Sequence, residues 1–101
     1  MNIDTYKKSN SLRLKIDGRI DTKSAPKLED IINDSLDGIN CLILDFEKVE
    51  YISSAGLRVL LIAQKKMNRQ GDMKVLNVNG DVMEIFDVTG FSDILTIEKE
   101  R

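Results

Sequence analysis

The sequence predicts a single α/β domain over residues 1–101, with a mixed sheet of about four to five strands in the order β-β-α-β-α-β-α-β. Three observations predict it: an N-terminal stretch with a period of two, three stretches with helical periodicity, and short apolar runs between them. The sheet should be parallel where a helix connects two strands, with helices packed against it. A chain of 101 residues suits one domain and is too short for two ordinary ones.

The first third of the chain predicts a β-hairpin. Residues 3–7 form a modest strand, and residues 8–10 form a polar turn. Residues 12–16 alternate strictly between apolar and charged side chains, which predicts a strand with one buried and one solvated face. The Asp17-Gly18 pair that follows indicates a turn or a bulge.

The next two elements are a helix and a buried strand. Residues 24–36 carry an apolar stripe at helical spacing, with Thr22 or Ser24 as the N-cap, Pro26 in the first turn and Gly38 after the end. Residues 41–44, which begin with Cys41, are an unbroken apolar run that ends at Asp45. Such a run is typical of a central strand covered on both faces, where Cys41 would be an inert core thiol.

The remaining elements follow the same periodicity. Residues 55–69 form the strongest predicted helix, with a wide apolar arc and Gly71 as its stop. A strand over 73–78, a short helix over 81–88 closed by Gly90, and a last strand over 94–97 complete the domain. We expect the final four residues, EKER, to be frayed.

The composition excludes several classes of function. The chain has no histidine and a single cysteine, so it lacks the side chains for a Ser-His-Asp triad, a Cys-His nucleophile or a zinc site, and we expect no enzyme activity, metal or cofactor. A net charge of −2 argues against binding nucleic acid. The longest apolar stretch, residues 57–63, is too short to span a membrane, and we read no export signal at the N-terminus. These features predict a cytoplasmic protein without a membrane segment.

Two serines at the start of the strongest helix are the main candidates for chemistry. Ser53 and Ser54 would lie beside unpaired backbone N–H groups at the positive end of the helix dipole. One of these serines can cap the helix, and a phosphate would be favoured at the same place because helix N-termini attract anions. With no histidine as a base, neither serine is a nucleophile in its own right, so any activating base would have to come from another protein.

Acidic residues offer weaker candidates. Asp21 ends the GRID segment, where it can cap the first helix or face the same end of the sheet as the serines. Asp45 could accept phosphate as in a receiver domain, but the first strand ends in Tyr6-Lys7-Lys8 instead of the acidic residues that bind Mg²⁺. We therefore expect Asp45 to accept hydrogen bonds at a strand end, and residues 45, 47 and 50 to form a solvated acidic edge.

Three segments resemble a known family. GRIDTKSAPKLEDII, LILDFEKVEYISSAGLRVLL and VMEIFDVTGFSDIL, in this order and spacing, resemble the STAS domain of bacterial anti-sigma-factor antagonists, from about Leu12 to Leu95. The resemblance implies a mixed sheet with helices chiefly on one side. It also implies reversible binding to a serine kinase that holds a sigma factor inactive, and a metal-dependent serine phosphatase that resets the switch.

The resemblance also implies the site. The phosphorylated serine of the family lies two residues before the turn glycine, which makes it Ser54, and many phosphorylated members have Asp directly before it. Here that place is Ser53, which is a rival acceptor. Asp21 corresponds to the aspartate of the G-x-[IL]-D motif. The implied partner-binding residues are Asp21, Thr22, Ser53, Ser54, Ala55, Gly56 and Arg58.

Two other functions stay open. A STAS interaction module of a larger signalling or transport assembly would use the same surface without phosphorylation, and the missing Asp before Ser54 favours this reading slightly. A receiver-like switch would be phosphorylated on Asp45. The missing acidic residues that would bind Mg²⁺ argue against this function.

Overall fold

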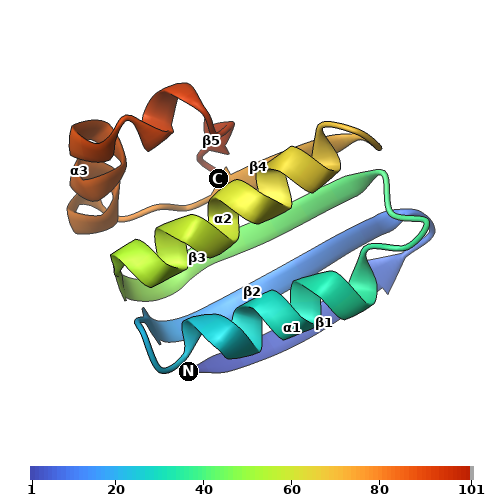
Figure 1. Cartoon of the computed structure of the whole chain (residues 1–101), viewed down its shortest axis with the longest axis horizontal. Helices are drawn as coiled ribbons and strands as arrows, with labels where there is room; N and C mark the ends of the chain where they lie inside the picture. The colour runs from blue at the N-terminus through green and yellow to red at the C-terminus, as the bar shows by residue number, and fades with distance from the viewer. Residues whose placement is uncertain (101) are drawn as a thin grey trace.

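The computed structural model describes residues 1–100 as a five-stranded mixed sheet with two helices side by side across one face (Figure 1). The strands, in sheet order, are β1 (Asn2–Lys8), β2 (Ser11–Ile20), β3 (Cys41–Ile52), β4 (Asp72–Leu76) and β5 (Ile97–Glu98). The helices are α1 (Ala25–Ser35), α2 (Ser54–Met67) and α3 (Gly80–Thr89), followed by a 3-10 turn at Phe91–Asp93. The predicted fold class and element order are confirmed.

The strand directions follow from the connections. β1 and β2 form the antiparallel hairpin, and β2, β3, β4 and β5 run parallel to one another. α1 and α2 are the crossovers that bring the chain back to start β3 and β4 (Figure 1). The carboxyl ends of β2 and β3 therefore lie at the same end of the sheet, together with the N-termini of α1 and α2.

β2 is longer than predicted because the Asp17-Gly18 pair continues the strand and does not turn the chain, while β3 bulges beside it with one extra residue at each of two points. The pairing register with β3 shifts between Lys15 and Asp17 and again between Gly18 and Arg19, and Gly18 has a φ of +115°. Only glycine takes this conformation readily. The strand then continues to Ile20, which delivers Asp21 to the carboxyl end of the sheet.

β3 is the middle strand, as predicted, but two expectations about it are wrong. It does not end at Asp45: the strand runs on to Ile52, because Val49 and Ile52 are buried and pair with the far part of β2. It is also not covered on both faces, since the helices pack on one face and Ile43 and Cys41 remain partly exposed on the other. Cys41 is therefore not a fully buried core thiol.

The C-terminal part departs from prediction in a similar way. β4 ends at Leu76, and Asn77 then turns the chain with a φ of +62°. The last strand is only Ile97–Glu98, because residues 91–93 form the 3-10 turn. Residues 98–100 are not frayed: the Glu100 backbone N–H donates a 2.9 Å hydrogen bond to Asn77 Oδ1. The fourth residue of the expected frayed end, Arg101, lies outside the described residues.

The core lies between the sheet and the helices. α1 buries Ala25, Leu28 and Ile32, and α2 buries a wider set that runs from Leu57 to Met67. α3 is anchored to the middle of β3 by the aromatic pair of Phe86 and Phe46, whose ring centroids are 6.3 Å apart. No helix within residues 1–100 is both long and apolar enough to cross a membrane.

Candidate functional site

Ser53 is the N-cap of α2. Its backbone is extended, with φ −93° and ψ 176°, and its hydroxyl oxygen accepts a 3.4 Å hydrogen bond from the backbone N–H of Gly56. Its carbonyl oxygen accepts the first intrahelical bond, from Leu57 N–H at 2.9 Å. Ser53 is half-buried. This hydroxyl satisfies one of the N–H groups that a helix start leaves unpaired.

Ser54 is the first residue of α2 and is exposed to solvent. Its hydroxyl makes no hydrogen bond to any other residue in the range 1–100. The first turn of α2 contains no acidic side chain, so no carboxylate of the helix occupies the positive end of its dipole. The two adjacent serines thus differ: Ser53 caps the helix, and Ser54 presents a free hydroxyl where an anion is favoured.

Gly56 fixes how closely α2 approaches the sheet. A Cβ atom at this position would lie 2.6 Å from Ile52 Cγ1 and 2.7 Å from Ile20 Cγ2. Real Cβ atoms do not approach other atoms so closely, so any larger residue would push the helix away from the ends of β2 and β3. Gly56 is buried and contributes to the site by its small size, while its side-chain position offers no contact to a partner.

Asp21 lies beside the start of α2. The reason is that Ile20, the residue before Asp21, accepts a 2.8 Å hydrogen bond at its carbonyl oxygen from the Ser53 N–H. Its Oδ1 accepts hydrogen bonds from the backbone N–H groups of Ser24 and Lys23, both at 3.0 Å. The Ser24 N–H, the Ser24 hydroxyl and the Lys23 N–H together hold the pKa of Asp21 below its ordinary value. The Asp21 carboxylate therefore stays ionised and organises the loop before α1.

Ser24 does not cap α1 through its side chain, although it stands at the N-cap position. Its hydroxyl donates instead to the Arg19 carbonyl oxygen at 2.7 Å. The Asp21 carbonyl oxygen accepts a 2.8 Å hydrogen bond from Ala25 N–H at the start of the helix. Asp21 and Ser24 thus hold this loop together, through hydrogen bonds to each other and to the start of α1.

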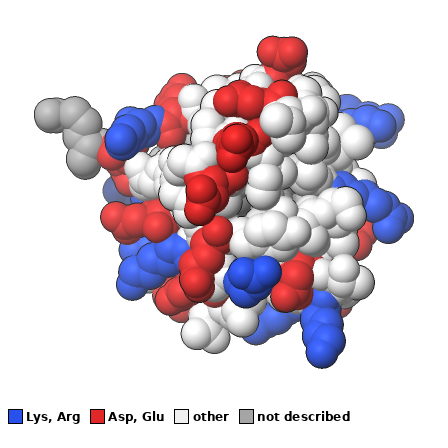
Figure 2. Space-filling model, turned by 90° about the vertical axis from the view of Figure 1, so that its left-hand side faces the viewer, with Lys and Arg blue, Asp and Glu red and all other residues white. Residues whose placement is uncertain are grey.

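The other predicted partner-binding residues lie in the β2–α1 loop and in the first two turns of α2. Thr22 and Arg58 are exposed, and Ala55 is partly buried. Figure 2 shows this end of the molecule, where uncharged surface lies beside a band of acidic side chains, with basic side chains toward the rim. The structure therefore brings the residues from the β2–α1 loop and from α2 onto one end of the domain.

One contact at this end was missed from the sequence. The Arg19 guanidinium lies over the ring of Tyr51, 4.5 Å from its centroid. Arg19 and Tyr51 are register partners in β2 and β3, directly after the second register shift. Predicting the pair would have required knowing that β2 continues past residue 16 and β3 past residue 45.

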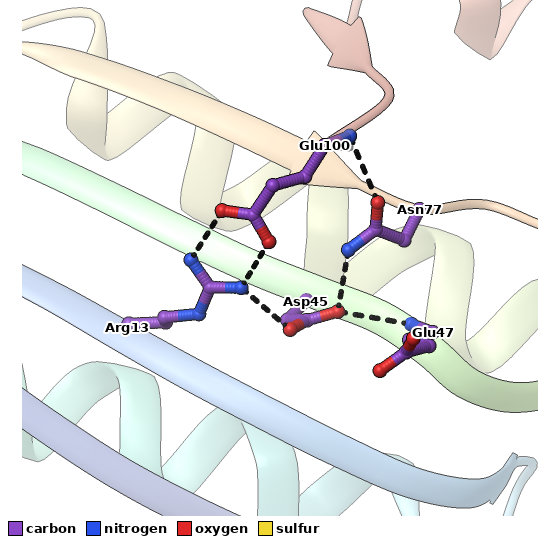
Figure 3. Close-up of polar contacts among 5 residues, drawn as sticks. All are labelled: Arg13, Asp45, Glu47, Asn77 and Glu100. Carbon is purple, nitrogen blue, oxygen red and sulfur yellow. Dashed lines mark hydrogen bonds and ion pairs between the residues drawn. The ribbon is translucent and has the colours of Figure 1, made fainter.

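Asp45 belongs to a different part of the molecule (Figure 3). It is only 3% exposed and accepts hydrogen bonds from Arg13 Nη2 at 2.7 Å, Glu47 N–H at 3.0 Å and Asn77 Nδ2 at 3.2 Å. Burial raises its pKa, but the Glu47 N–H, Arg13 and Asn77 together outweigh burial, and the pKa lies below its ordinary value. Arg13 also binds both carboxylate oxygens of Glu100.

This cluster is structural. The prediction that Asp45 accepts hydrogen bonds is confirmed, but its place in a solvated acidic edge is wrong, because the carboxylate is buried while Glu47 and Glu50 are exposed. A buried carboxylate with three hydrogen-bond donors is poorly placed to receive a phosphoryl group. Within residues 1–100, no three Cys, Asp or Glu side chains are grouped to hold a metal ion.

Comparison with known proteins gives a consistent result. The model of the STAS domain family matches residues 2–101. A protein named as an anti-sigma factor antagonist, BtrV of Bordetella bronchiseptica, is 32% identical over 88 residues, which cover 85% of this chain and 76% of BtrV. The anti-sigma-B factor antagonist of Staphylococcus aureus is 25% identical over 101 residues, which cover 98% of this chain and 94% of the relative.

Solved structures agree with this fold. The anti-sigma factor antagonist SpoIIAA in its unphosphorylated form superposes with a TM-score of 0.78 at 12% identity, covering 99% of this chain and 89% of SpoIIAA. The phosphorylated form of SpoIIAA from Bacillus gives a TM-score of 0.75 at 14% identity, covering 95% and 90%. At these sequence identities the likeness shows the fold alone, and this chain shares that fold with both the unphosphorylated and the phosphorylated form of SpoIIAA.

Proposed function

This chain belongs to the STAS domain family, and we propose that it is an anti-sigma factor antagonist that binds a serine-kinase anti-sigma factor and is switched off by phosphorylation of Ser54. The names of its relatives support the general role. The partner would contact the end of the domain formed by the β2–α1 loop and the start of α2. The partner-binding residues are Asp21, Thr22, Ser53, Ser54, Ala55, Gly56 and Arg58, with Gly56 acting by its size.

The observation that carries this proposal is the free, exposed hydroxyl of Ser54 at the first position of α2. The kinase would transfer the γ-phosphoryl group of ATP to Ser54 Oγ, so that one P–O bond forms and the bond to ADP breaks. The hydroxyl proton leaves to a base of the kinase or to solvent. This domain supplies the acceptor and the docking surface, and it performs no catalysis itself.

The site also separates the two serines. Ser53 uses its hydroxyl as the cap, so its phosphorylation would disturb the bond to Gly56, while Ser54 has no such bond to lose. Aspartate and serine are both strong N-caps. Serine in place of the family's aspartate at position 53 therefore keeps the capping role, and Ser54 remains the favoured acceptor.

The magnitudes indicate that phosphorylation changes partner binding rather than the fold. A phosphate adds about −1.5 to −2 charges at pH 7. At an exposed helix N-terminus such a charge stabilises by about 0.3–1 kcal/mol. At a protein interface fitted to a neutral hydroxyl it can cost several kcal/mol, and ~2.7 kcal/mol is about a hundredfold in affinity.

The rest of the cycle follows from this role. A metal-dependent serine phosphatase would remove the phosphate and restore binding. The protein would act in the cytoplasm, where sigma factors bind RNA polymerase, and it would need no cofactor of its own.

The proposal is tested by incubating the protein with the serine-kinase anti-sigma factor of the same organism and ATP, followed by mass spectrometry of the intact protein and its peptides. We expect one stable phosphate on Ser54, which is absent from Ser54→Ala and retained in the control Ser53→Ala. A labile acyl phosphate on Asp45 would support a receiver-like switch. Binding without any modification would support a STAS interaction module of a larger signalling or transport assembly.

A further inference from the structure

Arg58 lies one helical turn after Ser54 on the same face of α2. The two residues are at positions i and i+4, whose Cβ atoms are about 6 Å apart on a helix. Both are exposed. Any group attached to the Ser54 hydroxyl is therefore within reach of a long side chain at position 58.

The direction of the helix favours a contact between them. Side chains on an α-helix lean toward its N-terminus, so the Cα–Cβ bond of Arg58 is tilted toward the turn that contains Ser54, and the long side chain can reach that turn. An acidic group at i and a basic group at i+4 is also the more favourable order for such pairs. The planar guanidinium can donate two parallel hydrogen bonds to phosphate oxygens, which an ammonium group cannot do.

Arg58 has no acidic neighbour on its own helix. The sequence of α2, SAGLRVLLIAQKKM, contains no Asp or Glu, and the positions three and four residues from Arg58 are all uncharged. No ion pair within residues 1–100 involves Arg58. The other cations of α2, Lys65 and Lys66, lie in its last turn, about 16–18 Å along the axis from Ser54.

From this arrangement we infer that the Arg58 guanidinium binds the phosphate group on Ser54 and thereby stabilises the phosphorylated form of the domain. The inference rests on the proposed function only for the source of the phosphate. It adds a second effect to the switch. The phosphate introduces a dianion and also withdraws the free guanidinium of Arg58 from the partner-binding surface.

The test uses phosphoserine introduced at position 54 during translation, so it does not depend on any kinase. Thermal unfolding is measured for the phosphorylated and unmodified forms of the wild-type protein and of Arg58→Gln. We expect phosphorylation to raise the melting temperature more in the wild type than in Arg58→Gln, by about 1–4 °C. This difference should shrink in 1 M NaCl, where ion pairs are screened.

The matched control is Lys65→Gln, which removes a cation from the same helix beyond reach of the phosphate. It should leave the gain on phosphorylation unchanged, and Arg58→Lys should keep only part of it. As a second readout, ³¹P NMR should show a lower phosphate pKa with Arg58 than with Gln at this position. Asp21 and Lys23, in the neighbouring loop, are present in both the wild type and Arg58→Gln, so their electrostatic effects on the phosphate cancel in the comparison.

Equal gains in melting temperature and equal phosphate pKa values in the wild type and Arg58→Gln would overturn the inference. This result would leave the proposed function untouched. Conversely, a failure of the kinase to modify Ser54 would remove the proposed function, while the behaviour of the phosphoserine protein would still decide the role of Arg58.

Discussion

The backbone N–H of Ser53 donates a 2.8 Å hydrogen bond to the carbonyl oxygen of Ile20. This bond joins the end of β2 to the start of α2, two segments more than thirty positions apart in the sequence. It places Asp21 and Ser54, the residues that follow the two partners, at the same end of the sheet. A phosphate on Ser54 would thus be added to a scaffold that is already fixed.

The two serines should contribute differently to stability. Ser53→Ala removes the N-cap and should lower the free energy of unfolding by about 1 kcal/mol, and Ser53→Asp should restore most of it. Ser54→Ala should change it by less than about 0.5 kcal/mol, because Ser54 is exposed. Urea unfolding of the three variants measures this. Equal losses for the two alanine variants would contradict the assignment of the cap.

Gly56 should not tolerate a methyl group. Gly56→Ala places a Cβ atom within 2.6–2.7 Å of Ile52 and Ile20, and overpacking of this kind costs about 1–3 kcal/mol. The gain in helix propensity, up to about 1 kcal/mol, offsets only part of this cost, and we expect a net loss of stability of up to about 2 kcal/mol.

Gly80→Ala is the matched control for this variant. Gly80 is also near a helix start, but a Cβ atom there would meet nothing within 4 Å. The control should be as stable as the wild type or more stable, by up to about 1 kcal/mol. Thermal unfolding compares the two, and a Gly56→Ala variant as stable as Gly80→Ala would contradict the close approach of α2 to the sheet.

Asp45 should make stability depend on pH in the acid range. Its pKa is lower in the folded protein than in the unfolded chain, so it stabilises the fold above the unfolded value of about 4 and this contribution is lost as the pH falls below it. Asp45→Asn should lower the free energy of unfolding by about 1–3 kcal/mol at pH 7, with the difference from the wild type shrinking toward pH 2.

The control for Asp45 is Glu100→Gln. Glu100 is about half exposed, so the loss of its pair with Arg13 should be the smaller effect at pH 7. Urea unfolding at several pH values measures both variants. A penalty for Asp45→Asn that is the same at pH 7 and pH 2 would show that the carboxylate charge does not stabilise the fold.

The sequence predicted the helices better than the strand ends. The periodicity of residues 55–69 placed α2 within two residues at each end, because a wide apolar arc and Gly71 mark it clearly. The end of β3 was misplaced because residues 45–52 alternate irregularly, contain the bulges of β3, and are held by long-range pairing with the far part of β2. No local pattern records a partner strand more than thirty positions away.

At the site, too, residue types predicted some features, and others depended on contacts between distant parts of the chain. That one serine caps the helix followed from residue types alone, but which serine does so depends on the geometry at Gly56. The burial of Asp45 was not predictable either, because its donors come from distant parts of the chain: Arg13 lies in β2, and Asn77 directly follows β4. Glu100 reaches Arg13 only when β5 is in place.

The central claim is tested most directly by titration calorimetry of the serine-kinase anti-sigma factor with unmodified protein and with protein carrying phosphoserine at position 54. The account predicts that the phosphorylated form binds at least about a hundredfold more weakly, with both forms equally folded by circular dichroism. Equal affinities for the two forms would contradict it.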